Sequence, residues 1–459
     1  MGEVLRNRPL LSLTAGLLIG LTLREYLWNA ILLVPLFALL KAPRPCLVLC
    51  AGFLIGALLS PAIPQKGVQS TRYIESEARI VSVPRVYPNR IAYEIEVQGH
   101  RLVVTDARQA DRSLGDQLRV AGLVKPLREG SEAYLLSKGI VGRFSPVRIG
   151  VLSEGPSWSR MALQVREAFI KFSQRTLAPE RAAILDALCF NVEGALSDEQ
   201  EESLRSTGTI HIISASGLHV LILAISIDWL LGFLPIPRPA RIVALGLILG
   251  FYAAAAGLQP AIIRSVVMSM VGLIAYWWNR EGDLLSSLAL AASGYLVIDP
   301  MGVYNLGFQF SFLTVAAFGL FGAIKDHVPK TALAAFAEQA KDAFQTTHVA
   351  YWATLPLLLF YFGTVSIMAI PSNLIIVPVV MVLVIGGIGA FALSHLWQGF
   401  GQILMAGLVD PLCAYLNWVL GLFGNLIKVD LAGGFFSGYW LLIVYLLLSF
   451  LVRERVRPA

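Results

Sequence analysis

The sequence Thr207-Gly-Thr-Ile-His-Ile-Ile-Ser-Ala-Ser-Gly-Leu-His-Val220 opens a long apolar region, yet it is rich in hydroxyl groups and contains two imidazoles. On a continuous helix, His211 and His219 would lie on roughly the same side, about two turns apart. Ser214, Ser216 and Gly217 between them favour close backbone approach or a break in the helix. Polar groups at membrane depth are costly unless they face a bundle interior or a water-filled path. We therefore expect this segment to line such a path. Helix–helix packing through small and hydroxylated residues is the alternative that the residue types leave open.

The composition predicts a polytopic membrane protein. Of the 459 residues, 56% are hydrophobic and only 14% are charged, which is not typical of a soluble domain. The net charge is +6, and the basic residues lie mostly in short loops and at the ends, which suits control of topology better than a nucleic-acid surface. The four cysteines have neither the spacing of a disulfide framework nor that of a metal site. We therefore expect no metal and no cofactor.

Residues 1–64 form the first predicted region, with apolar transmembrane segments near 9–23, 26–40 and 46–63. Basic residues precede the first segment and separate the second from the third. The positive-inside rule then places the N-terminus in the cytoplasm and the following residues outside. A cleaved signal peptide is disfavoured, because the first segment leads into more apolar sequence without a small-residue cleavage site.

Residues 65–150 form a predicted β domain. Hydrophobic and polar residues alternate in short runs such as Ile91–Val97, and several such strands in about 80 residues indicate a small barrel, for which an OB-fold fits the length. Between residues 70 and 150 there are 13 basic and 9 acidic side chains. An OB-fold that binds single-stranded DNA needs a basic groove and stacking aromatics. The alternative is an ordinary solvated surface with tyrosines in the core. The candidates for DNA contact are Arg85, Tyr87, Arg90, Tyr93 and Arg101.

Residues 151–206 carry apolar side chains at helical spacing, among them Trp158 and Phe169, interleaved with basic residues. This pattern predicts amphipathic helices on the membrane surface. A soluble helical linker packed against the barrel is the alternative.

Residues 207–459 form the predicted channel domain, with about nine further spans of roughly 20 residues. With the β domain outside, the basic residues of the connecting segments fall in the cytoplasm, except Lys428. The predicted fold is an all-α polytopic membrane protein of about 12 transmembrane helices, with an inserted small all-β OB-like domain and both termini in the cytoplasm. The expected spans are 209–234, 240–257, 261–278, 284–299, 303–324, 349–366, 371–394, 400–425 and 437–452.

Polar residues inside these spans are candidates for a pore lining. Arg264 lies about one helical turn from the outer boundary, where it could snorkel to headgroups or offer a cation to a phosphate. For Gln309 and Ser311 the alternative is polar helix packing, and for Asn373, which follows Pro371, it is a helix cap. The complete set of pore-lining candidates is His211, Ser214, Ser216, Gly217, His219, Arg264, Gln309, Ser311 and Asn373.

The order of these residues resembles the signature of the ComEC family of competence proteins. The Ser-Gly-Leu-His-Val ending of the opening stretch follows Arg205-Ser-Thr-Gly-Thr-Ile-His211. The resemblance extends over roughly residues 70–390. The further matching pieces, in the same order, are Gly257-Leu-Gln-Pro-Ala-Ile-Ile-Arg264, Asp299-Pro300, Gly307-Phe-Gln-Phe-Ser311, and Asn373 with Pro378.

The resemblance implies an inner-membrane channel for the uptake of single-stranded transforming DNA. It also implies an OB-like domain before the channel, interfacial helices after that domain, contact with lipid, a DNA receptor outside the membrane and a cytoplasmic helicase-type motor. A transporter or exporter of small solutes on the same scaffold, without nucleic acid, is the alternative.

Some chemistry of long family members is absent from this sequence. Many ComEC-like proteins continue into a metallo-β-lactamase-like domain, whose His-x-His-x-Asp-His motif does not occur here. We therefore expect a chain that is not an enzyme. It is either a short member of the family, or the nuclease is a separate protein or has been removed from this chain. Energy from ATP would come from a partner, because no phosphate-binding loop is present. An intramembrane hydrolase is disfavoured, because no nucleophile elbow surrounds the serines of the opening stretch.

Overall fold

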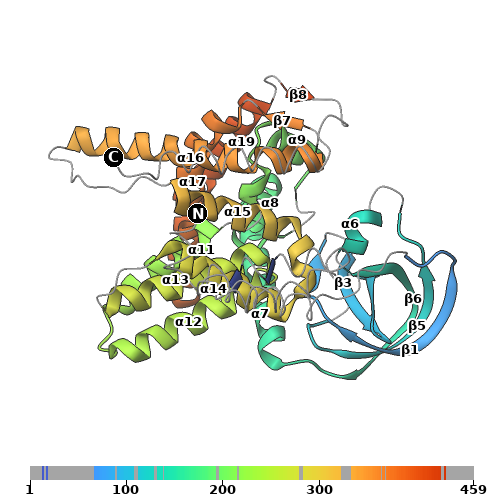
Figure 1. Ribbon diagram of the computed structural model, residues 1–459. Coiled ribbons are helices and arrows are strands. Elements are labelled where there is room, and N and C mark those ends of the chain that lie inside the picture. The colour runs from blue at the N-terminus through green and yellow to red at the C-terminus, as the bar shows by residue number, and fades with distance from the viewer. Residues whose placement is uncertain are drawn as a thin grey trace, which may run out of the picture.

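A computed structural model of the chain contains a β barrel and a mostly helical domain, which lie side by side (Figure 1). The predicted spans at 26–40, 46–63 and 437–452, and most of 9–23, lie outside the described residues. The structure describes residues 13–14, 17–18, 67–87, 90–107, 112–128, 132–137, 139–192, 196–213, 217–278, 283–321, 332–362, 364–366, 368–424 and 428–430.

The barrel forms because its sheet closes on itself. β1 pairs antiparallel with both β5 and β3, while β6 pairs antiparallel with β5 and parallel with β4. Alternate residues of these strands point inward and form a single apolar core, as the period of two in the sequence predicts. The elements of this domain are β1 (Arg72–Ile80), β2 (Arg85–Val86), β3 (Arg90–Val97), β4 (His100–Ala107), β5 (Gln117–Lys125), α6 (Glu132–Ser137) and β6 (Ile140–Ser153).

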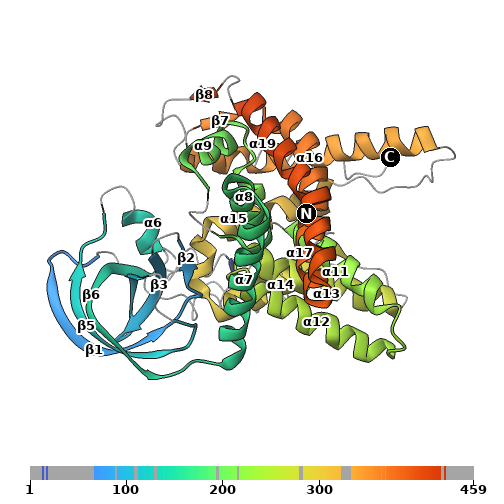
Figure 2. The ribbon, with the colours of Figure 1, turned by 180° about the vertical axis from the view of Figure 1, so that it is seen from behind.

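The helical domain begins with three helices that follow the barrel directly. Figure 2 shows the first two following one another along the back of this domain. The third starts with a capping box, in which the Ser197 hydroxyl accepts a hydrogen bond from the Gln200 amide and the Gln200 side chain accepts one from the Ser197 amide. These helices are α7 (Ser157–Thr176), α8 (Pro179–Phe190) and α9 (Asp198–Ser206).

The remaining helices follow the predicted spans closely, with two exceptions. α16 begins before the predicted 349, because its helical pattern continues into a less apolar segment. The last described span contains a π-helical turn, η2, between its two α-helical parts. The elements are α10 (Ile210–Ile213), α11 (Gly217–Leu231), α12 (Arg238–Ala255), α13 (Pro260–Trp277), α14 (Leu284–Ile298), η1 (Pro300–Tyr304), α15 (Leu306–Phe321), α16 (Ala332–Phe362), β7 (Thr364–Ser366), α17 (Ala369–Leu396), α18 (Gln398–Leu404), η2 (Met405–Val409), α19 (Asp410–Gly424) and β8 (Lys428–Asp430).

The core of the helical domain is built around α8, which is buried from Ala182 to Phe190. α7, α17 and α19 contact it, and the rings of Phe169 and Phe190 meet at 4.8 Å between centroids. α8 therefore differs from the expected interfacial helix, because neighbouring helices cover all its sides. α7 keeps the predicted amphipathic character, with Trp158 exposed and Phe169 buried.

The outer surface of the helical domain is apolar. Leu247, Tyr276 and Trp418 are each more than 60% exposed, and apolar surface of this extent is typical of a region that contacts lipid. Thr14, in the first predicted span, donates a hydrogen bond to the Ala289 carbonyl of α14. Among the described residues, four helices are long and apolar enough to cross a membrane, namely Arg238–Ala255, Pro260–Trp277, Ala369–Leu396 and Gln398–Gly424.

Candidate functional site

The structure describes the opening stretch in two pieces, α10 as far as Ile213 and α11 from Gly217. The expectation that both histidines lie on one side of a continuous helix therefore stays a prediction. Gly208 precedes α10 with φ +70°, and a Cβ there would come within 2.7 Å of the Ala369 Cβ. A glycine is therefore required where this turn meets the start of α17. Ser214 and Ser216 lie outside the described residues, as does the side chain of His211.

Three of the predicted residues meet at the start of α11. Arg264 of α13 is only 7% exposed, and its Nε donates a hydrogen bond to the Ser311 hydroxyl of α15 at 2.9 Å. Gly217 lies against this guanidinium, because a Cβ there would overlap Arg264 and lie 2.5 Å from the Ser265 hydroxyl. The structure therefore joins α11, α13 and α15 around one cation.

The other contacts of Arg264 are apolar or weakly polar. Its Nη1 lies 3.7 Å from the Met268 sulfur, and the guanidinium carbon lies 5.9 Å from the centroid of the Phe312 ring. Within the described part of the chain, no carboxylate lies at ion-pair distance from Arg264. A buried cation held in this way retains its attraction for an anion.

The remaining helical candidates have separate environments. His219 is 1% exposed, on the first turn of α11. The Gln309 side chain donates to the Val303 carbonyl at 3.0 Å, within the turn that precedes its own helix. Asn373 is the fifth residue of α17, so it does not cap that helix. Among the described residues its buried Oδ1 has no hydrogen-bond partner, and the same is true of the neighbouring Ser372 hydroxyl.

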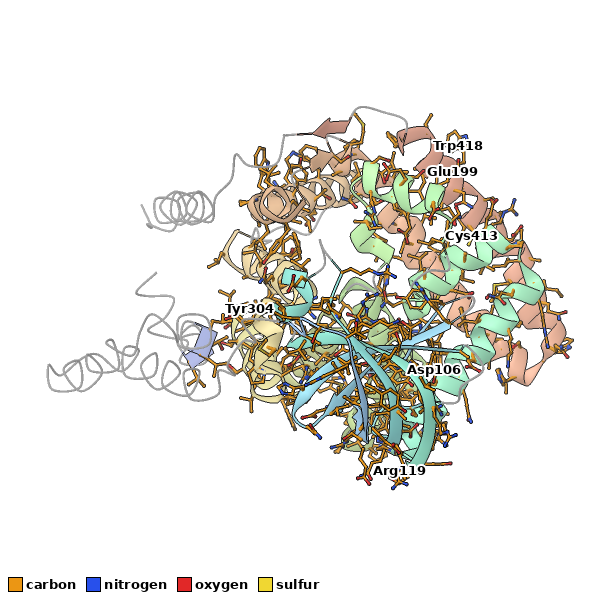
Figure 3. The ribbon with its side chains drawn as sticks, turned by 90° about the vertical axis from the view of Figure 1, so that its right-hand side faces the viewer. Asp106, Arg119, Glu199, Tyr304, Cys413 and Trp418 are labelled. Atoms are coloured by element: carbon orange, nitrogen blue, oxygen red, sulfur yellow. The ribbon has the colours of Figure 1, made fainter. Side chains whose placement is uncertain are left out.

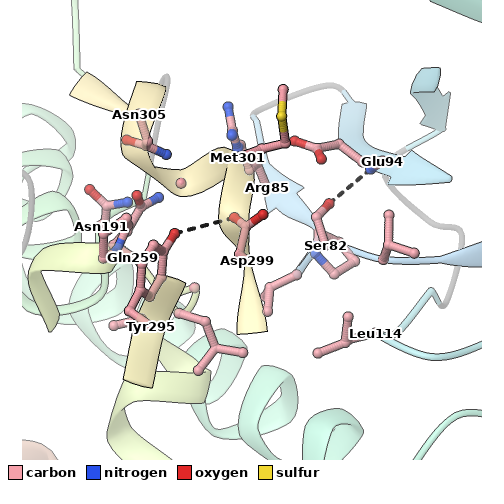
Figure 4. A pocket seen from close by; sticks show the side chains of 18 of the residues that line it. Ser82, Arg85, Glu94, Leu114, Asn191, Gln259, Tyr295, Asp299, Met301 and Asn305 are labelled. Atoms are coloured by element: carbon pink, nitrogen blue, oxygen red, sulfur yellow. Dashed lines mark hydrogen bonds between the residues drawn. The ribbon is translucent and has the colours of Figure 1, made fainter. Parts of the chain in front are cut away.

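A second polar region is a cavity of about 190 Å³ between the barrel and the helical domain (Figure 4). On the side of the helical domain, the wall of the cavity is formed by turns at the ends of helices. α12 ends in a Schellman motif, in which the amides of Gly257 and Leu258 donate to the carbonyls of Ala254 and Ala253. Gly257 has φ +95°, which explains the glycine at this position. Pro260 then starts α13 with its φ preset for a helix.

Polar side chains from both domains line this cavity. Arg101 of β4 lies 3.9 Å from Asp299, measured from Nη1 to Oδ1. The Tyr295 hydroxyl donates to Asp299 Oδ2 at 3.4 Å, as the dashed line in Figure 4 shows. Arg85 and Glu94 contribute the other charged groups of the barrel wall. The cavity therefore joins residues that are far apart in the sequence.

The predicted DNA contacts of the barrel fall into three groups. Arg85 and Arg101 line the cavity. Tyr87 and Arg90 form a cation–π pair outside it, with the guanidinium carbon 5.1 Å from the ring centroid. Tyr93 is buried in the barrel core, and its hydroxyl donates to Asp106 at 3.1 Å. Burial, followed by the charge of Asp106, raises the pKa of Tyr93. Stacking on a base by Tyr93 is therefore excluded unless the barrel opens.

Several cavity residues were not predicted as site residues. Gln259 and Asp299 belong to the short motifs that carry the resemblance to the ComEC family, so the sequence did contain a signal for these two residues. Arg166 and Asn191 carried no such signal, because only the tertiary structure brings α7 and the end of α8 to the cavity. Asn191 adopts a left-handed conformation, with φ 51°, where α8 ends.

These features define a membrane protein with a β-barrel domain beside a helical domain that holds a buried cation. The family model described as Competence protein matches residues 188–458. The chain belongs to this family, and the resemblance expected from its sequence motifs is confirmed.

Two curated relatives carry names that agree with this assignment. The chain is 27% identical over 301 residues to ComE operon protein 3 of Bacillus subtilis (strain 168), covering 65% of this chain and 37% of that protein. It is 31% identical over 242 residues to Competence protein ComA of Neisseria gonorrhoeae, covering 47% of this chain and 34% of that protein. The matched part is thus about a third of the length of each relative. No solved structure matches.

Proposed function

We propose that this chain forms the channel through which single-stranded DNA crosses the inner membrane during genetic competence. Membership of the competence family supports this proposal, as do the four helices long enough to span a bilayer. The observation that carries it is the burial of Arg264 on α13 without a carboxylate among the described residues. Burying a cation within a membrane span costs free energy, and contact with a passing phosphate would offset that cost.

The position of Arg264 agrees with a path from the barrel into the membrane. Pro260 at the start of α13 lines the cavity between the barrel and the helical domain, and Arg264 follows about one helical turn further along α13. The contact between Gly217 and the guanidinium places the opening stretch beside the same group. The proposed lining therefore includes Gly217, Arg264 and Ser311, and we add His219, two residues after Gly217 on the first turn of α11.

The finer architecture is part of the proposal. Five strands of the six-stranded sheet, β1, β5, β6, β4 and β3, close the barrel, and the two-residue β2 pairs with β3. This closure supports an OB-like domain, since OB-folds are small five-stranded barrels that bind oligonucleotides at one face and its loops. We place this domain outside the membrane, both termini in the cytoplasm, and about 12 spans in the whole chain. The charge pattern of the connecting segments supports this orientation.

Partners complete the proposed pathway. An extracytoplasmic receptor would deliver DNA, a cytoplasmic helicase-type motor would pull the strand, and a separate nuclease would degrade the other strand. In this scheme the chain transports and does not catalyse. Transport of a small solute on the same scaffold is the competing outcome of the test.

The test uses a naturally transformable host in which this chain replaces the deleted native channel. Labelled DNA that becomes resistant to external nuclease measures internalisation, and immunoblotting of membranes measures abundance. We expect internalisation with the wild-type chain, and DNA that binds the cell but stays accessible to nuclease without it. A small-solute transporter would be indicated if internalisation did not depend on this chain in a host where it is correctly inserted.

A further inference from the structure

The barrel face that carries Arg85 and Arg101 is turned toward the helical domain. Both residues line the cavity between the domains, and Arg101 approaches Asp299 of the helical wall. Figure 4 shows Arg85 and Glu94 on the barrel side, with Gln259 and Asn305 across from them. A ligand held by these arginines would therefore contact both domains at once.

The charge of the lining favours an anion. The lining contains three guanidinium groups and two carboxylates, which leaves an excess of one positive charge. The guanidinium groups are those of Arg85, Arg101 and Arg166, and the carboxylates are those of Glu94 and Asp299. The ion pair between Arg101 and Asp299 is long, at 3.9 Å, and both side chains are about one-third exposed. A phosphate oxygen can approach a planar guanidinium more closely and with two hydrogen bonds.

The uncharged lining favours a nucleobase beside that phosphate. The amide side chains of Asn191, Gln259 and Asn305 offer both donors and acceptors, as the edge of a base requires. Asp299 Oδ1 is buried without a hydrogen-bond partner among the described residues, so it can accept from an N–H group of a base, such as the N3–H of thymine. Neither a simple anion nor an apolar chain would use this set of groups.

The volume sets the size of the ligand. At about 190 Å³ the cavity is smaller than the 300–1,000 Å³ of pockets that hold drug-sized molecules. It therefore takes at most part of one nucleotide, such as the phosphate and the edge of one base, and it does not admit a base pair with its backbones.

We propose that this cavity binds one nucleotide of single-stranded DNA between the barrel and the helical domain, with its phosphate at Arg85 and Arg101 and its base at Gln259 and Asn305. This inference rests on the proposed function and adds where the strand is held before it enters the membrane. The barrel supplies the two arginines that bind the phosphate, and the helical domain supplies the amides. Neither domain alone has the complete site.

The test measures binding of a fluorescent oligothymidylate by the full chain in lipid nanodiscs. Gln259→Glu and Asn305→Asp each add a carboxylate of nearly unchanged size to the helical wall, and the first is compatible with folding because an acidic residue is favourable at a helix N-terminus. We expect each to weaken binding about tenfold, the effect of one charge-assisted contact. Arg101→Gln should also lower the slope of log affinity against log salt by about 0.7, because one phosphate contact is lost.

The matched control is Arg119→Gln, which removes a positive charge from the exposed side of β5. Figure 3 shows Arg119 at the outer rim of the barrel, well separated from Tyr304 at the end of η1. This variant should bind the oligonucleotide as the wild type does. Tight binding that is lost in Arg119→Gln but kept in Gln259→Glu and Asn305→Asp would overturn the composite site and leave the proposed function standing.

Two competitors identify the source of the phosphate. Inorganic phosphate, or anionic lipid added to the nanodiscs, should compete only weakly, since neither offers a base to the amides. Competition by either one as strong as that by unlabelled oligothymidylate would overturn the assignment to DNA. Absence of any oligonucleotide binding by the full chain, at low salt and with normal folding, would count against both this site and the proposed function.

Discussion

Two arginines of the helical domain, on adjacent helices, have contrasting partners. Arg241 of α12 donates from Nε to the Asp228 carboxylate at 2.8 Å, donates to the Asp228 carbonyl, and lies 4.9 Å from the centroid of the Trp277 ring. Arg264 of α13 has the Ser311 hydroxyl, a thioether and a more distant ring. Arg241 is also the less buried of the two.

The difference separates a structural cation from a candidate functional one. Arg241 is fully explained by the residues around it, since its charge is balanced by a carboxylate of the adjacent helix. Arg264 is more buried, so its desolvation costs more free energy, and its partners offset less of that cost. A buried charge of this kind is stable when other groups or a ligand of opposite charge interact with it. The partners of an arginine, more than its depth, therefore indicate which of the two belongs to a transport path.

The largest expected effect comes from neutralising each arginine in turn. Arg264→Gln should reduce DNA internalisation per molecule about tenfold or more, because a hydrogen bond to a charged group contributes about 1.5–3 kcal/mol, and membrane abundance should change little. Arg241→Gln should instead reduce abundance, because the carboxylate of Asp228 loses its counter-charge. Internalisation assays and quantitative immunoblots on the same cells measure both quantities.

Arg264→Lys provides the conservative variant for this pair. Lysine keeps the charge but lacks the planar guanidinium that contacts Ser311, so we expect intermediate internalisation. If Arg264→Gln and Arg241→Gln both lowered abundance and left internalisation per molecule unchanged, the contrast between the two arginines would be purely structural.

The next effect concerns the close approach of α11 to α13. Gly217→Ala places a Cβ where the Arg264 guanidinium now lies, so we expect internalisation to fall severalfold through displacement of that group. In an Arg264→Gln background the shorter side chain leaves room, and Gly217→Ala should add little. A double-mutant cycle on internalisation per molecule measures this coupling. Additive losses would mean that Gly217 acts independently of the arginine.

The sequence predicted the elements of this molecule well, because their patterns are local. Alternation in residues 91–97 marked a strand that is β3, and the apolar span 261–278 differs by one residue at each end from α13. Glycine and proline in the motif Gly257-Leu-Gln-Pro260 reflect a helix end followed directly by a helix start. Each of these signals depends only on neighbouring residues.

Partners across the fold could not be predicted in the same way. Asp228 had no evident partner in the sequence, and Arg241 supplies it from the next helix. Tyr93 alternates correctly, but the pattern does not say which face of a closed barrel is inside. The pairing of Arg101 with Asp299 depends on how two domains dock, for which no periodicity in either segment carries information.

An effect on stability and not on transport is expected from a buried acid, where the same question of compensation arises. Asp186 of α8, which is not among the candidate spans, is 0% exposed, and the Ser173 hydroxyl donates to its Oδ1 at 2.5 Å. Burial raises the pKa of this carboxyl to about 7, although the Ser173 hydrogen bond and the charge of Arg166 lower it. Unlike Asp228, it is not neutralised by a close ion pair among the described residues.

The sign of the pH dependence follows from that raised pKa. The unfolded chain releases the proton near pH 4 and the folded chain near pH 7, so the free energy of unfolding should fall as pH rises through this window and then level off. The full shift corresponds to at most about 4 kcal/mol. Asp186→Asn should remove most of the difference in melting temperature between pH 5 and pH 8, measured by thermal unfolding of the purified protein. An unchanged difference would show that other groups cause it.

The smallest effect is expected at His219, whose burial on the first turn of α11 fits either a transport lining or helix packing. His219→Gln keeps a side chain that donates and accepts hydrogen bonds, whereas His219→Leu keeps similar bulk without polarity. If the histidine contributes only to packing, leucine should act through stability alone, by the roughly 0.6–1.7 kcal/mol of one interhelical hydrogen bond, and internalisation per molecule should stay normal. If it belongs to the path around Arg264, leucine should lower internalisation per molecule severalfold while glutamine preserves part of it.

The two variants are compared in the same host at matched membrane abundance, so that a loss of folded protein is not read as a loss of transport. Normal internalisation with leucine at this position would remove His219 from the proposed lining and leave Arg264 as the polar group on which the path depends.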